Sequence, residues 1–165
     1  MTPKIKRVFF LSLAGFLILV FVVSLSSFFF KNPPQEYTKE DFYFTHITKV
    51  IDGDTVEIEG GYRVRYIGID TPEKGECFYQ EATQKNKELV EGKEVKLERD
   101  ILEIDEYDRL LYYIWIDDVL INEYLIEEGY AYSSPYPPNV KYLKRLEEAQ
   151  EKAEESKKGL WLKCD

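Results

Sequence analysis

Three β-type segments separated by two glycine turns constrain the fold of this chain more than any other feature. Residues 43–51 are aromatic and β-branched, whereas 55–59 and 62–69 alternate in polarity with the period of two that is typical of strands. Asp52-Gly53 and Gly60-Gly61 separate these segments, and dipeptides of this kind form hairpin turns. The run therefore predicts a three-stranded β-meander.

The remainder of the chain predicts two more strands and several helices. In order, the patterns indicate a helix at 81–90, strands at 94–98 and 110–116, a short helix at 121–126 and a long charged helix at 140–158. Gly68, inside the third meander segment, indicates a bulge or a close backbone approach. Together these elements predict a mainly β fold with appended helices (α+β), namely a five-stranded OB-fold barrel with about three helices.

An uncharged apolar segment at 8–30 follows three basic residues near the N-terminus. A run of about 20 apolar residues spans a bilayer, and flanking basic residues stay on the cytoplasmic side. We therefore expect residues 1–30 to form one N-terminal transmembrane helix that anchors the chain in the membrane. The alternative is a signal peptide cleaved near Ser24 or Ser26, although the apolar run resumes after these serines.

Either reading of the apolar segment sends the rest of the chain out of the cytoplasm. We expect an exported protein anchored to the cytoplasmic membrane, with secretion after cleavage as the alternative. A polar linker at 31–41 leads to one domain at 42–165. After residue 30 the chain has 19 basic and 31 acidic residues, a net charge of −12. This balance argues against binding nucleic acid through a basic surface, but not against a small metal-bridged site.

The counts of cysteine and histidine narrow the chemistry. In an oxidising compartment Cys77 and Cys164 favour one disulfide over two unrelated thiols. The loop closed would span 87 residues, which the chain-entropy model makes worth about 4–5 kcal/mol. The one histidine, His46, lies in a β-type segment and is expected to be a strand residue. Acid–base chemistry would therefore fall to carboxylates, tyrosines, lysines or a metal.

Two strands that are one hairpin apart each have a carboxylate next to one end. Asp54 and Asp70 become neighbours if these strands pair, and Pro72 restricts Thr71 to an extended backbone that can aim its carbonyl. Two carboxylates, a carbonyl and waters suit Ca2+ or Mg2+. The alternative is that these acids are simply turn residues at the rim of a barrel, and Asp52 fits either description.

Two further side chains near these acids suit phosphate chemistry. Glu73 lies three residues after Asp70, close enough to orient a water molecule. Arg65 lies on the strand that leads to Asp70, and a guanidinium binds two phosphate oxygens at once. The residues alone therefore leave two alternatives, a phosphate-binding metal site and a set of surface charges.

Three blocks in this order resemble the signature of the staphylococcal-nuclease-like (thermonuclease) family: VIDGDT at 50–55, RYIGIDTPE at 65–73 and DEYDRLLYY at 105–113. The resemblance covers about residues 44–161, including INEYLIEEGYA at 121–131. It implies an OB-fold phosphodiesterase that uses Ca2+. The blocks occur in the family's order, which makes the three together far more specific than any one of them.

The resemblance also implies a role for each matched residue. These are metal ligands Asp54, Asp70 and, through its carbonyl, Thr71; the general base Glu73; phosphate-binding Arg65 and Arg109; Tyr107 and Tyr136 near the nucleotide; and Asp52 near the metal. The implied reaction is hydrolysis that leaves 3′-phosphate ends. The metal would hold the phosphate, the glutamate would take a proton from water or orient it, and the arginines would stabilise the added charge.

Asp108 and the acidic net charge depart from the family's pattern. The family often has glycine before the second arginine, and the extra charge of Asp108 would weaken the hold of Arg109 on phosphate. We expect a monomer that cuts DNA and/or RNA, with single strands preferred. The alternatives are a non-catalytic OB-fold interaction module and an exported calcium-binding structural domain.

Overall fold

The computed structural model describes residues 42–164, all within one compact unit. The predicted transmembrane segment at 8–30 and the linker at 31–41 lie outside the described residues. Within the described part of the chain, no helix is both long and apolar enough to cross a bilayer.

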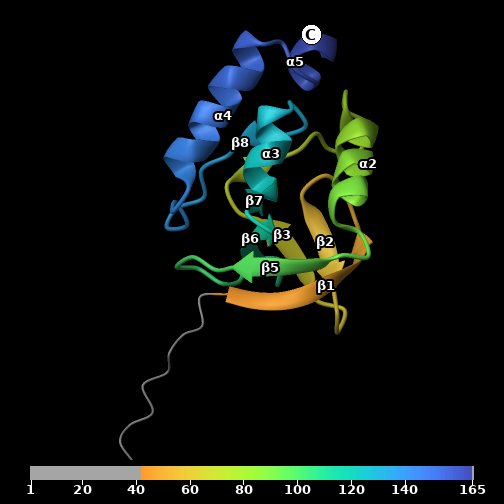
Figure 1. Ribbon diagram of the computed structural model, residues 1–165, viewed down its shortest axis with the longest axis vertical. Coiled ribbons are helices and arrows are strands. Elements are labelled where there is room, and N and C mark those ends of the chain that lie inside the picture. Colours follow the sequence, from red (N-terminus) through yellow and green to blue (C-terminus); the bar gives the residue numbers. More distant parts are fainter. Residues whose placement is uncertain (1–41, 165) are drawn as a thin grey trace, which may run out of the picture. The chain divides into compact units, whose positions relative to one another are not determined.

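Five strands close into a barrel (Figure 1). They are β1 (Phe42–Val50), β2 (Thr55–Ile58), β3 (Arg63–Tyr66), β5 (Glu94–Glu98) and β6 (Leu110–Ile116). Antiparallel pairings join β3 to β2, β2 to β1, β1 to β5 and β5 to β6, and a parallel pairing of β3 with β6 closes the barrel. The predicted five-stranded barrel is therefore confirmed, and its closure fits an OB fold.

The inward-facing side chains of the strands form the core of the barrel. Ile47, Val56, Val64, Leu97 and Ile114, one from each strand, are completely buried. Each such side chain contributes about 1.5–3 kcal/mol when it leaves water. The apolar residues of the segments that were predicted as strands therefore include the side chains that hold the strands together.

The helices are α2 (Tyr79–Val90), α3 (Ile121–Glu127), α4 (Leu143–Glu155) and α5 (Leu160–Lys163). Figure 1 shows α3, α4 and α5 gathered on one side of the barrel, with β1 and β5 on the other. The first three correspond to predicted helices, whereas α5 and the short strands β4 (Ile69–Asp70), β7 (Val119–Leu120) and β8 (Tyr132–Ser133) were not predicted.

The end of α4 differs from the prediction that this helix reaches Lys158 and is capped by Gly159. Lys157 adopts the left-handed conformation, with φ +51°, and the backbone N–H of Lys158 donates to the carbonyl of Ala153. This arrangement is a Schellman cap, formed here without glycine. Gly159 instead lies against Gly129, where an added Cβ would come within 2.2 Å of the carbonyl oxygen.

The predicted strand at 62–69 is broken by a kink at Gly68, whose φ of +78° is in the left-handed region that favours glycine. The four carbonyls of residues 66–69 all accept hydrogen bonds. Arg65 Nη1 donates to the first and last of them, at 3.0 and 2.8 Å. Asn122 Nδ2 and the Ser134 N–H donate to the other two, at 2.8 and 2.9 Å. The kink is therefore fully satisfied and redirects the chain into β4.

Substitution of Gly68 by alanine is expected to destabilise the chain more than substitution of Gly92. Both glycines have positive φ, +78° and +74°, so each alanine incurs about 1–2 kcal/mol of left-handed strain. A Cβ at Gly68 would also lie 2.6 Å from Cδ1 of the buried Leu146, which adds an overpacking cost of about 1–3 kcal/mol. Urea unfolding of the two variants measures the difference. Equal losses would show that α4 does not press on the kink.

Candidate active site

Asp54 lies at the centre of the site, directly before β2, and is only 6% exposed. Its Oδ1 accepts a hydrogen bond from Thr55 Oγ1 and pairs with Arg65 Nε, both at 3.1 Å. Its Oδ2 accepts from the N–H and the hydroxyl of Thr71, at 2.9 and 2.8 Å. These four donors occupy the four lone-pair sites of the carboxylate and fix its orientation, so a cation bound at Asp54 would replace one of them. Thr71 was predicted to offer its backbone carbonyl to a metal. In the structure it contacts Asp54 through its N–H and its hydroxyl.

Arg65 connects Asp54 to Asp70, since its Nη2 donates to Asp70 Oδ1 at 2.8 Å. Asp70 is exposed at the end of β4, where the kink has brought it back towards Asp54. Partial burial raises the pKa of Asp70 above its ordinary value, and the charges of Asp54 and Glu76 add to this rise against the opposing Arg65. The site therefore has more negative charge than its arginine neutralises.

Asp52 supports Asp54 from the preceding turn. Its Oδ1 accepts a hydrogen bond from the Asp54 N–H at 3.1 Å, and its own carbonyl accepts from Asn86 Nδ2 at 3.0 Å. The amide oxygen of Asn86 in turn accepts a hydrogen bond from the buried Tyr66 hydroxyl. Burial raises the pKa of Asp52, and the charge of Asp54 raises it further. The structure thus gives Asp52 a turn-forming role next to the site.

The donor set suits a hard divalent cation. Asp54 and Asp70, both paired with the Arg65 guanidinium, offer carboxylate oxygens, the ligands that Ca2+ and Mg2+ prefer. Within residues 42–164, no three His, Cys, Asp or Glu side chains gather into a complete metal-binding group. A cation held by Asp54 and Asp70 would therefore need backbone, water or substrate oxygens as further ligands.

Arg65 and Arg109 line the same narrow cleft, with a volume of about 90 Å³, together with Tyr136. Arg109 is tethered by Asp105, whose Oδ2 lies 2.7 Å from Arg109 Nε and whose Oδ1 accepts the Arg109 N–H at 2.9 Å. Burial raises the pKa of Asp105, but these hydrogen bonds and one from the Tyr107 N–H outweigh it, so the pKa lies below its ordinary value. Asp105 thus orients the second arginine.

Asp105 is a site residue that the sequence reasoning missed. Its signal was a carboxylate four residues before an arginine in the block DEYDR, of which only Tyr107 and Arg109 were assigned roles. Asp108, directly before Arg109 at the position where glycine was expected, has a φ of +60°, in the region that favours glycine. Aspartate tolerates the left-handed region better than most residues do, so the loop keeps its shape.

Tyr107 and Tyr136 both lie close to Arg109. The Arg109 Cζ atom is 5.4 Å from the ring centroid of Tyr107, within cation–π range, and 71% of Tyr107 is exposed. Tyr136 is 40% exposed and forms part of the cleft wall. Both predicted nucleotide-side tyrosines therefore have an accessible ring beside the second arginine.

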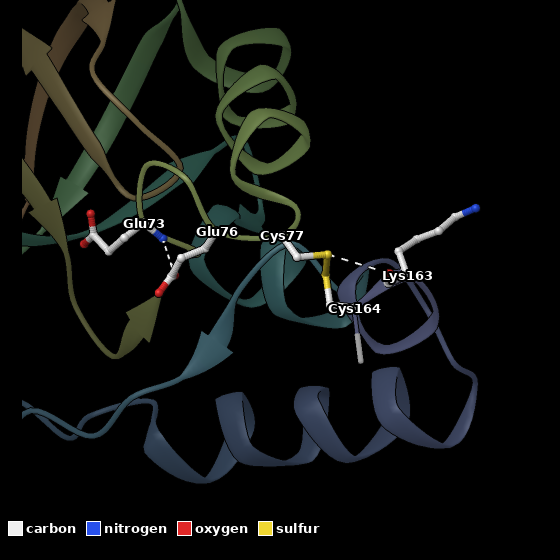
Figure 2. The surroundings of a disulfide bond; sticks show 5 residues. All are labelled: Glu73, Glu76, Cys77, Lys163 and Cys164. Atoms are coloured by element: carbon white, nitrogen blue, oxygen red, sulfur yellow. Dashed lines mark hydrogen bonds between the residues drawn. A yellow bond between two sulfur atoms is a disulfide. The ribbon is translucent and has the colours of Figure 1, made fainter.

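Glu73 is exposed in the loop between β4 and α2. Its N–H donates to Glu76 Oε2 at 2.7 Å, and Figure 2 shows its own carboxylate pointing away from the nearby disulfide. Across the described residues the Glu73 carboxylate has no ion pair or hydrogen bond. The Glu73 carboxylate is therefore open to solvent.

A disulfide joins Cys77, four residues after Glu73, to Cys164 at the end of α5, with their Cα atoms 5.8 Å apart (Figure 2). This is the pairing favoured over two unrelated thiols. The bond closes a loop of 87 residues, so the chain that holds Glu73 is connected covalently to the far end of the domain.

Asp54 contacts both Thr71 and Arg65, and Arg65 contacts Asp70. Arg109 and Tyr136 line the cleft that Arg65 also lines. Tyr107 lies beside Arg109 on an exposed loop, and Glu73 follows Asp70 by three residues on another exposed loop. The structure thus brings the acids Asp54 and Asp70 together with Arg65, beside the cleft that Arg109 lines.

Comparison with known proteins gives one consistent result. Residues 63–163 match the family described as Staphylococcal nuclease homologue. The thermonuclease of Staphylococcus hyicus is 36% identical over 141 residues, covering 80% of this chain and 82% of that protein. The thermonuclease of Staphylococcus intermedius is 36% identical over 124 residues, covering 70% and 74%.

A further relative is the endonuclease YncB of Bacillus subtilis (strain 168), which is 35% identical over 128 residues, covering 71% of this chain and 61% of that protein. The family match includes Arg65, Asp70, Glu73 and Arg109. The chain therefore belongs to the staphylococcal nuclease homologue family and is a nuclease, an enzyme that hydrolyses phosphodiester bonds.

Proposed function

We propose that this nuclease is a Ca2+-dependent endonuclease that cuts DNA and/or RNA, preferably single-stranded, and leaves 3′-phosphate ends. One observation carries the proposal. Asp54 and Asp70 meet at Arg65, and the same cleft wall includes Arg109. Oxygen donors for a hard cation thus lie beside two guanidinium groups that suit phosphate. When bound by these aspartates, Ca2+ supplies charge neutralisation for the phosphate.

The two arginines have different tasks in this proposal. Arg65 uses all three nitrogens inside the protein, on Asp54, Asp70 and two kink carbonyls. Arg109 uses only Nε and its backbone N–H, on Asp105, and among the described residues its terminal nitrogens make no hydrogen bond or ion pair. Those nitrogens can bind two oxygens of the phosphate and stabilise the charge added during hydrolysis. Arg65 chiefly holds the aspartates in place.

Glu73 is the proposed general base. Its carboxylate is exposed, unpaired within residues 42–164 and three residues from Asp70. It takes a proton from the attacking water or orients that water, a role that contributes about 10²–10⁴-fold in rate. No histidine is needed, which agrees with a chain that has only one.

We further propose that the enzyme works as a monomer outside the cytoplasm, anchored in the cytoplasmic membrane through residues 8–30. The uncharged apolar segment and the disulfide support export, since disulfides persist in oxidising compartments.

Glu73→Gln is expected to lower kcat by about 10²–10⁴-fold on long single-stranded DNA and RNA, because it removes the base and keeps the shape. The whole chain, in detergent, is assayed with Ca2+ and with a chelator, which is expected to abolish cleavage. Glu81→Gln, an exposed glutamate on α2, serves as the control and keeps full activity. A wild type no faster than Glu73→Gln would sink the enzyme proposal, and calcium binding without cleavage would favour a structural domain.

Asp105→Asn is expected to lower kcat/KM by up to about 100-fold, because Arg109 loses its tether. It should also lower the free energy of unfolding by about 1.5–3 kcal/mol, the range for a hydrogen bond to a charged group. The pKa of Asp105 is lower in the folded chain, so its ionised form stabilises the fold above the unfolded pKa, and this contribution is lost as pH falls through the folded value.

The stability difference between wild type and Asp105→Asn should therefore be constant near neutral pH and shrink below about pH 4. Urea unfolding across this pH range measures it, with the exposed neighbour Glu106→Gln as the control. A difference that stays the same down to pH 2 would contradict the assigned role of the Asp105 charge.

A further inference from the structure

The open end of the barrel contains a second cleft, larger than the one beside the arginines. Its volume is about 270 Å³, and its lining is mostly apolar and aromatic: Tyr43, Tyr62, Tyr112 and Arg99, with Ile58 and Leu97. Mouths of β-barrels are common ligand sites. None of these residues has a role in the catalytic proposal.

The strand pairings place this cleft at the barrel mouth. The start of β1 lies beside the end of β5, the end of β2 beside the start of β3, and the start of β3 beside the start of β6. Tyr43 lies two residues before the buried Thr45, and Tyr62 lies two residues before the buried Val64. Because side chains two residues apart share a face of a strand, both tyrosines continue a core-facing row towards the mouth.

Two of these rings are exposed in a way that core residues are not. Tyr43 is 49% exposed and Tyr62 is 62% exposed. Beside them, the Arg99 side chain is 25% exposed and pairs with Glu103 at 2.9 Å. Accessible aromatic rings next to an arginine are the combination on which nucleobases stack in proteins that bind single strands.

The mouth and the phosphate cleft lie on the two faces of the start of β6. Leu110 lines the mouth and directly follows Arg109, while Leu111 lines the cleft beside the arginines. Tyr62 directly precedes β3 and lies three residues before Arg65, about 10 Å along the chain and on the opposite face of the strand. A single strand held at the arginines would therefore pass over the start of β6 to bring a nearby base to the mouth.

The charge of the protein favours a contact that does not depend on attraction to phosphate. A net charge of −9 for the whole chain provides little of the counterion-release affinity by which most nucleases could hold a polyanion. Stacking is independent of that charge and contributes about 1–3 kcal/mol per base. Resting on the endonuclease function proposed above, we infer that the barrel mouth, through Tyr43 and Tyr62, is a stacking subsite for a base next to the scissile phosphate.

Tyr62→Ser tests the subsite, with Phe44→Ser as the matched control. Both aromatic residues are 62% exposed, but Phe44 belongs to a different surface hollow, beside Lys96 and Trp115. Steady-state kinetics is measured on a long single-stranded oligonucleotide and on a mononucleotide p-nitrophenyl phosphodiester, which has no neighbouring base. Tyr62→Leu is measured in parallel, because it keeps an apolar side chain and removes only the ring.

Both Tyr62 variants are expected to raise KM for the oligonucleotide by about 5–150-fold, the equivalent of one lost stack. Cleavage of the mononucleotide ester should match that of Phe44→Ser. An unchanged oligonucleotide KM in an otherwise active enzyme would overturn the subsite alone. So would a lower melting temperature with unchanged KM, since the mouth would then serve packing within the chain. A wild type that cleaves neither substrate would overturn the endonuclease proposal and the subsite with it.

Discussion

The guanidinium of Arg65 is the interaction on which the rest of the site depends. Its Nε pairs with Asp54, its Nη2 with Asp70, and its Nη1 donates to two carbonyls of the kink that separates β3 from β4. The side chain is only 16% exposed, and charges removed from water in this way need partners with good geometry. One residue therefore fixes the backbone turn, the direction of β4 and the distance between two acidic side chains.

This dependence changes how the two arginines should be understood. In the sequence they are equivalent candidates for binding phosphate. In the structure Arg65 uses four of its five N–H groups on internal partners, whereas Arg109 is held at Nε by Asp105 and keeps its terminal nitrogens for a ligand. Loss of Arg65 would thus disturb the fold and the site together, and loss of Arg109 would chiefly affect phosphate. The acidic surplus around Arg65 is the physical reason to expect a cation there.

Much of the fold was predictable because strand periodicity and turn dipeptides are local signals. They gave the meander, the later strands and the neighbourhood of Asp54 and Asp70. The kink at Gly68 was not predictable in detail, since its carbonyls are satisfied by Asn122 and Ser134, more than fifty residues away.

The features that the sequence did not predict depend on contacts with distant residues or on unusual backbone conformations. Strand β4 exists because it pairs with β8, a contact that no local pattern records. Helix α4 ends at a left-handed lysine, Lys157, where glycine is the usual sign. Asp105 could have been found from its spacing to Arg109, but its value to the site appears only when both hydrogen bonds are seen.

The central claim is that Asp54 and Asp70, positioned by Arg65, form a cation site. The most direct measurement is the melting temperature of the whole chain with Ca2+ and with a chelator, because a ligand that binds only the folded state stabilises it by mass action. The account predicts that Ca2+ raises the melting temperature of the wild type and of Glu81→Gln, and that Asp70→Asn loses this rise. No rise in the wild type, or an equal rise in Asp70→Asn, would contradict it.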